Sequence, residues 1–278
     1  MFNQQKMIGY HVGKTFLHGL SGASKLIFFI LVSVAAMMSY DTRFLLLVAL
    51  ASLMLFRVSE IRLKDISFVL AFAGTFAALN ILMVYLFAPQ YGVEIYGAKD
   101  LLWTGWGAYN LTLQELFYLL NLLLKYFSTI PLAVIFLMTT HPSQFASSLN
   151  QIGLSYKIAY AVSLTLRYIP DLQEEFYLIK MSQEVRGQEL SKKAPLSKRV
   201  KGNLQIVIPL IFSSLERINT IATAMELRRF GKNKKRTWYT QQAFGKLDKL
   251  VILVSVLLLA LSLLLFLVNQ GRFYNPWA

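Results

Sequence analysis

Two arginines stand at matching places in the second half of the sequence, in the runs Val185-Arg186-Gly187 and Leu227-Arg228-Arg229. Each run closes a long stretch in which apolar residues recur at helical spacing. A cation in the last turn of a helix interacts favourably with the helix dipole, which is one explanation of both endings. A guanidinium at a helix tip can also form a forked pair of hydrogen bonds with a carboxylate of a docked protein. The repetition favours docking of a soluble partner at two places.

The other polar residues form no catalytic or metal-binding pattern. His11, His18 and His141 lack metal-ligand spacing and are expected to be structural. The sequence has no glycine-rich phosphate-binding loop and no serine nucleophile motif, so the chain is not expected to hydrolyse ATP. It has no cysteine, which excludes disulfides, thiol catalysis and thiolate metal sites. We therefore expect a protein that is not an enzyme and holds no cofactor or metal of its own.

The composition is typical of a membrane protein. The 278 residues are 56% hydrophobic and 15% charged, with a mean hydropathy of +0.51, whereas soluble domains are about 45–50% apolar and about 25% charged. The formal net charge is +14. Nucleic-acid binding and basic inner loops beside anionic lipid both account for such a charge. The hydrophobic segments favour the lipid bilayer as the partner, with no nucleic acid.

Five hydrophobic segments are predicted to cross the bilayer, whose core of about 30 Å needs about 20 residues of helix. The first two are short, and they form either a tight helical hairpin, which we favour, or one kinked interfacial helix. Lys125 falls inside the fourth segment, where it is either functional or directed into the bundle interior or toward the membrane surface, and Pro131 is expected to kink this helix. The predicted spans are 22–40, 43–58, 66–88, 113–138 and 250–268.

The predicted fold class is therefore an all-α polytopic membrane protein with about five transmembrane helices and long cytoplasmic amphipathic helices. Residues 1–140 hold the first four transmembrane helices, 141–247 form a cytoplasmic or interfacial region, and 248–278 hold the last transmembrane helix and an aromatic tail. Within the middle region, Pro170 is expected to separate two helices, and Pro209 is expected to break or bend a third.

The distribution of basic residues predicts the orientation. Lysines precede the first span, basic residues lie between the second and third spans, and 141–249 is strongly basic, while the loops at 40–43 and 89–112 carry few cations. The positive-inside rule then places the N-terminus in the cytoplasm, and five spans place the C-terminus outside. The loop that contains Trp103, Trp106 and Tyr109 is expected to rest on the outer headgroups and not to bind a ligand.

The chain resembles the transmembrane T component of energy-coupling factor (ECF) transporters, which are ABC-type uptake systems for vitamins and metal ions. The resemblance covers nearly the whole chain and rests on the early paired spans, on Leu164-Thr165-Leu166-Arg167-Tyr168-Ile169-Pro170 and on the two arginine runs. The family carries two Ala-Arg-Gly-like motifs at the ends of cytoplasmic coupling helices. Both runs keep the central arginine; they depart from the motif at Val185, at Leu227 and at Arg229.

The resemblance implies a scaffold in the plasma membrane of a prokaryote. Two cytoplasmic ATP-binding subunits would bind the ATP, dock at the helix tips and drive motion of a small membrane S component, which binds the vitamin or metal ion. The docking residues would be Val185, Arg186, Gly187, Leu227, Arg228 and Arg229. The apolar faces of 143–169 and 203–222 would contact the S component, with Phe145, Leu149, Ile152, Leu166, Pro170 and Pro209 as candidate residues.

Two other classes stay open. A stand-alone channel or secondary transporter needs internal repeats or polar, broken spans near the midplane, and the predicted spans are plain. A membrane-embedded enzyme needs an acidic or histidine cluster that faces a cavity. The cargo cannot be read from this chain, because in the family that it resembles the S component selects it.

Overall fold

The computed structural model describes residues 15–105, 109–187, 196–233, 237–239 and 241–277. His11 and Trp106 lie outside the described residues. The chain divides into two compact units, Met1–Gln144 with Gln242–Ala278 and Phe145–Gln241. The elements are α1 Phe16–Gly19, α2 Gly22–Met38, α3 Thr42–Val58, α4 Leu63–Phe87, α5 Tyr91–Tyr96, β1 Leu101–Trp103, β2 Leu111–Thr112, α6 Leu113–Thr139, α7 Pro142–Gln151, α8 Tyr156–Val185, α9 Leu196–Leu227 and α10 Lys246–Val268.

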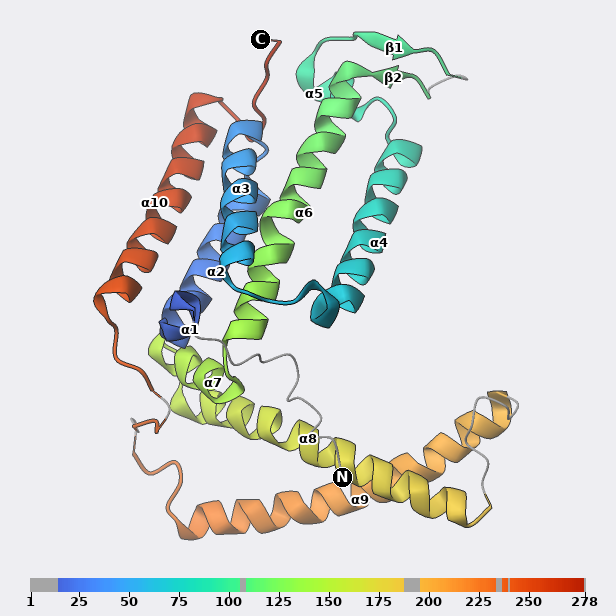
Figure 1. Cartoon of the computed structure of the whole chain (residues 1–278), viewed down its shortest axis with the longest axis vertical. Coiled ribbons are helices and arrows are strands. Elements are labelled where there is room, and N and C mark those ends of the chain that lie inside the picture. The colour runs from blue at the N-terminus through green and yellow to red at the C-terminus, as the bar shows by residue number, and fades with distance from the viewer. Residues whose placement is uncertain (1–14, 106–108, 188–195, 234–236, 240, 278) are drawn as a thin grey trace. The chain divides into compact units, whose positions relative to one another are not determined.

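The first unit is a helical bundle built around α6. This helix packs against α2, α3, α4 and α5, and α10 packs along α2 (Figure 1). Buried apolar side chains from α2, α3 and α6, such as Val32, Phe44 and Leu132, form one core cluster of the bundle. Many other apolar side chains of the bundle are exposed, notably Phe68 and Phe87 on α4, as expected for helices that face lipid.

The all-α polytopic fold is confirmed. By length and composition, α4, α6, α10 and residues 202–227 of α9 could each cross a membrane. Residues 22–58 form two separate helices, α2 and α3, of 17 residues each, and at 1.5 Å per residue each is about 25 Å long. The span-like composition of 202–227 was not foreseen, because that segment was assigned to the amphipathic region.

Two buried lysines tie α2 to α6. Lys25 Nζ donates to the carbonyl oxygen of Thr139 (2.8 Å), at the end of α6. Lys125 Nζ donates to the carbonyl oxygen of Met37 (2.8 Å) in the last turn of α2 and lies 3.2 Å from the ring centroid of Tyr40. Each ammonium thus meets the negative end of a helix dipole. Lys125 is directed into the bundle interior, where these contacts give it a structural role.

Asp248 ties the beginning of α10 to the beginning of α2. Its Oδ1 accepts hydrogen bonds from the Ser21 amide (2.8 Å) and the Ser24 hydroxyl (2.6 Å), and its Oδ2 accepts one from the Gly245 amide (2.8 Å). Asp248 is itself buried. One carboxylate therefore satisfies amide groups at two helix N-termini, where a negative charge is also favoured by the dipole.

The aromatic tail folds back against the end of the bundle. The Tyr40 amide donates to the Arg272 carbonyl (2.8 Å), and the Phe273 ring lies 4.6 Å from that of Tyr40. The Trp277 ring packs on Tyr96 at 5.4 Å. Burial raises the pKa of Tyr96 to about 12, so its phenol stays protonated at neutral pH. The tail thus completes the end of the bundle.

The segment between α4 and α6 has regular structure where the sequence predicted a loop. It contains the helix α5 and the short antiparallel sheet of β1 and β2. The Gly92 amide donates to Glu115 Oε2 (2.7 Å), and a Cβ on Gly92 would lie 2.6 Å from the backbone oxygen of Gln114. This backbone-to-backbone contact explains why α5 carries glycine where it meets α6.

Replacing Gly92 with alanine is expected to lower the free energy of unfolding by about 1–3 kcal/mol, since the added methyl group must displace backbone atoms. The measurement is the melting temperature of the purified protein in detergent. Gly74→Ala is the matched control, because nothing lies within 4 Å of its added Cβ and alanine favours the helix. Equal melting temperatures for both variants would contradict the proposed close packing.

Candidate partner-docking site

The second unit consists mainly of α8 and α9, which cross as an antiparallel pair (Figure 1). Toward their middles, Glu175 forms an ion pair with Arg217 (3.1 Å) and accepts a hydrogen bond from Ser213. The prediction of a helix boundary at Pro170 is wrong, and α9 likewise runs through Pro209. Each proline removes a single backbone hydrogen bond. Because the helices are 30 and 32 residues long, the loss of one bond interrupts neither of them.

The first arginine run forms the C-terminal tip of α8. Arg186 is the C-cap, and its amide donates to the Ser182 carbonyl (3.3 Å). Gly187 has a φ of +85° and its amide donates to the Glu184 carbonyl (3.0 Å). Glycine adopts this left-handed conformation without steric cost, so Gly187 is a suitable end of the helix. Val185 is 89% exposed beside the arginine.

The second run repeats this backbone at the tip of α9. The Arg228 amide donates to the Ala224 carbonyl (3.2 Å), and the Arg229 amide donates to the Glu226 carbonyl (2.8 Å). Arg229 has a φ of +52°, and Leu227 is 81% exposed. Helix α9 therefore ends before Gly231, because Arg229 already takes the conformation that Gly187 has at the first tip. The two runs differ in sequence but agree in geometry.

The arginines of both tips are exposed and carry no internal charge partner within the described part of the chain. The ion pairs there join other residues, such as Lys180 to Glu184 and Arg217 to Glu175. Arg186 and Arg228 thus present free guanidinium groups, each next to a large exposed aliphatic side chain. A partner groove with a carboxylate and an apolar wall would match such a tip.

Replacing Arg229 with glycine is expected to raise the free energy of unfolding by about 1 kcal/mol, because glycine relieves the left-handed strain. Gly187→Ala should lower it by a similar amount for the converse reason. Melting temperatures of the two variants in detergent measure both effects. A loss of stability in Arg229→Gly would show that its side chain, and not its backbone, stabilises this turn.

The weaker set of predicted surface residues is spread over three helices and one turn. Phe145 and Leu149 lie on α7, and Ile152 follows this helix. Leu166 and Pro170 lie on α8. All five side chains are partly buried. Of the six, Pro209 on α9 is exposed. These six side chains therefore offer a partner less accessible area than the sequence suggested.

An exposed apolar face lies on α9, within the range 203–222 where the sequence predicted one. We call it the α9 stripe; its members are Leu204, Ile208, Ile211, Leu215 and Ile218, each at least 50% exposed. Their spacing of four, three, four and three residues puts them on one side of the helix. All five members fall within the predicted range 203–222, although none of them was among the individually named candidate residues.

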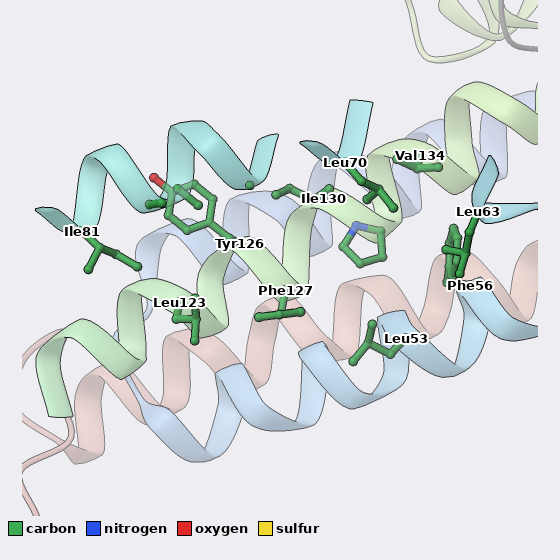
Figure 2. A pocket seen from close by; sticks show the side chains of 14 residues that line it. Leu53, Phe56, Leu63, Leu70, Ile81, Leu123, Tyr126, Phe127, Ile130 and Val134 are labelled. Atoms are coloured by element: carbon green, nitrogen blue, oxygen red, sulfur yellow. The ribbon is translucent and has the colours of Figure 1, made fainter. Parts of the chain in front are cut away.

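A cavity of about 450 Å³ lies in the first unit between α3, α4 and α6 (Figure 2). Leu53 and Phe56 reach it from α3, Leu70 from α4, and Tyr126 and Phe127 from α6. Of its 14 lining residues, Tyr126 alone has a polar side-chain group. The cavity suits apolar groups, and none of the predicted site residues lines it.

Across the described ranges, no cluster of three or more histidine, cysteine or acidic residues is placed to hold a metal ion. His141 has a local role: its Nδ1 accepts a hydrogen bond from the Ser143 amide (3.2 Å) at the start of α7. Burial lowers the pKa of His141, which favours the neutral imidazole that can accept this bond.

An all-helical bundle with several helices apolar enough to cross a membrane defines the class: an all-α polytopic membrane protein. The model of the CbiQ family, described as cobalt transport protein, matches residues 13–239, which include both tips, and the chain belongs to this family. It is therefore a multi-pass membrane transport protein and not an enzyme.

Individual relatives agree with this assignment. The chain is 30% identical over 156 residues to the energy-coupling factor transporter transmembrane protein EcfT of Exiguobacterium sibiricum, an alignment that spans 53% of this chain and only 58% of that protein. It is 24% identical to EcfT of Lactococcus lactis subsp. cremoris over 95% of this chain and 98% of the relative. For EcfT of Streptococcus thermophilus the identity is 25%, over 92% and 96%. The resemblance to the ECF transmembrane component is thus confirmed.

Proposed function

We propose that the chain is the transmembrane coupling subunit of an ECF-type ABC importer for a vitamin or a metal ion. In this proposal two cytoplasmic ATP-binding subunits dock on the tips of α8 and α9. The observation that supports it most is the backbone match between the tips, since two equivalent ends suit two equivalent grooves. ATP is bound and hydrolysed by the partners, so the chain itself needs no cofactor.

The docking residues in this proposal are those of the two tips. Arg186 and Arg228 pair with carboxylates of the ATP-binding subunits, and Val185 and Leu227 fill the apolar wall of each groove. Gly187 and Arg229 turn the chain away behind the arginine. Arg229 adds a second positive charge at the α9 tip, which raises attraction to an acidic groove.

A small membrane S component is proposed to pack on the apolar side of the helix pair. The α9 stripe supplies most of this surface, together with Pro209 and the accessible parts of Phe145, Leu149, Ile152, Leu166 and Pro170. Although residues 202–227 are apolar enough to cross a membrane, Glu216, Arg217 and Glu226 interrupt them. A helix with one apolar side and charged ends lies preferentially at the membrane interface.

The orientation follows from the same arrangement. The tips must face the cytoplasm, where ATP is available, and this agrees with the basic character of 141–249 and the positive-inside rule. The proposal therefore places the N-terminus in the cytoplasm and the C-terminus outside, in the plasma membrane of a prokaryote. The S component determines the cargo.

The first experiment is purification of the N-terminally tagged chain from native membranes in mild detergent, followed by ATPase assay and mass identification of bound proteins. We expect two ATP-binding subunits, a small membrane protein and ATP hydrolysis in one complex. Recovery of the chain alone, without ATPase activity, would overturn the proposal and favour a stand-alone channel or secondary transporter.

A further inference from the structure

Four aromatic residues join the tip of α9 to the beginning of α8. The Phe230 ring lies 5.6 Å from that of Tyr156 and 4.8 Å from that of Tyr160, and the Tyr160 ring lies 6.4 Å from that of Trp238. We call Tyr156, Tyr160, Phe230 and Trp238 the aromatic latch. All four belong to the second unit. Edge-to-face and tilted ring pairs at these distances are favourable beyond the area that they bury.

The backbone after Arg228 directs Phe230 into the latch. The Phe230 amide donates to the Met225 carbonyl (2.9 Å), and the Arg229 amide donates to the Glu226 carbonyl (2.8 Å). This pair of bonds, with Arg229 left-handed, is a Schellman turn. The turn reverses the chain within two residues, so that Arg228 remains at the exposed tip while the side chain of Phe230 reaches α8.

Burial of Tyr156 and a hydrogen bond of Trp238 hold the latch in place. Tyr156 is 5% exposed, and the indole Nε1 of Trp238 donates to Asn150 Oδ1 (3.1 Å). Asn150 Nδ2 in turn donates to the Leu154 carbonyl (2.8 Å), just ahead of α8. Phe230 therefore contacts the buried ring of Tyr156 and the ring of Tyr160, which in turn packs on the hydrogen-bonded Trp238. A shift of the α9 tip must displace these rings.

The latch is a second connection between the two helices, separate from the Glu175–Arg217 ion pair toward their middles. One contact between crossed helices permits rotation about it, whereas two separated contacts oppose that rotation. With both in place, the Arg228 tip and the beginning of α8 move together. The other end of α8 carries Arg186, so α8 links the two tips mechanically.

We propose that Phe230 is a positioning residue for Arg228: it sets the direction in which this arginine is presented and transmits movement of the α9 tip to α8. The inference rests on the proposed function, because its consequence is measured at the ATP-binding subunits. It goes beyond that function in assigning a role to an aromatic group outside both arginine runs.

The test is a double-mutant cycle between Phe230 and Arg228 in the complete complex, with association of the purified ATP-binding subunits as the readout. Phe230→Ala is expected to weaken association about fivefold to tenfold, and Phe230→Tyr, which keeps the ring, to restore it. In the Arg228→Ala background, Phe230→Ala should cause no further loss. In the Arg186→Ala background, Phe230→Ala should weaken association by the same factor as it does in the unmodified chain. Phe68→Ala, on an exposed ring of α4, is the matched control.

Independent, multiplicative losses for Phe230→Ala and Arg228→Ala would overturn the positioning role, as would unchanged association in Phe230→Ala. If Phe230→Leu kept association as well as Phe230→Tyr does, the effect would come from general apolar packing and not from an aromatic ring. The proposed function is tested separately by the single arginine variants of the same cycle: if neither Arg186→Ala nor Arg228→Ala weakens association, the docking assignment fails whatever Phe230 does.

Discussion

Replacing Arg186 or Arg228 with alanine is expected to weaken binding of an ATP-binding subunit by about 2–5 kcal/mol, because each substitution leaves a desolvated carboxylate of the partner without its cation. Both side chains are exposed and have no ion-pair partner among the described residues. The fold should therefore survive while transport falls. The measurements are subunit association in detergent, transport in cells, and the melting temperature of the isolated chain.

Further variants refine this result. Lysine at either position keeps the charge but loses the planar fork, so Arg186→Lys and Arg228→Lys should restore association only in part. Arg57→Ala removes an exposed arginine from the last turn of α3 and should leave both association and transport unchanged. Normal transport by the Arg186→Ala/Arg228→Ala double variant, with an intact complex, would rule out docking through these groups.

Asp248→Ala is expected to cause the largest loss of stability, about 3 kcal/mol. The substitution leaves the Ser21 and Gly245 amides and the Ser24 hydroxyl without their shared acceptor. It also removes a negative charge from the beginnings of both α2 and α10. The melting temperature of the purified chain in detergent measures the effect.

Asp248→Asn should lose less, since its amide oxygen can still accept a hydrogen bond although the charge is gone. Asp171→Ala, at an exposed position in α8, is the control for loss of an aspartate. A melting temperature for Asp248→Ala equal to that of the control would mean that the two helix beginnings are satisfied in another way.

Hydropathy and helix-stop signals predicted much of this architecture. Long apolar runs such as those of α4 and α10 identify helices directly, because burial in lipid requires a continuous apolar segment. The end of α8 was also predictable, since Gly187 is the residue type that a left-handed turn prefers. The central arginine of each candidate tip was therefore visible in the sequence alone.

Other features depend on contacts between distant residues. The left-handed turn at the end of α9 was not predictable, because Arg229 is not a residue type that signals such a turn. There the aromatic latch and the Schellman bonds act together. Asp248 and Ser21 are separated by 227 positions, so no local pattern marks their bond. The helix boundary predicted at Pro170 was wrong, because one proline does not decide whether α8 continues. Its continuation depends on the whole helix and on its packing against α9.

The connection of α10 to α2 has a consequence for biogenesis. The helix that covers α2, the aspartate that caps it and the aromatic tail that packs on the bundle are translated after α3 to α9. Until the ribosome has passed α10, α2 remains next to lipid or the insertion machinery. Chains that stop before Lys246 should thus be recognised as unfinished bundles by membrane quality-control proteases, which would link subunit abundance to synthesis of α10.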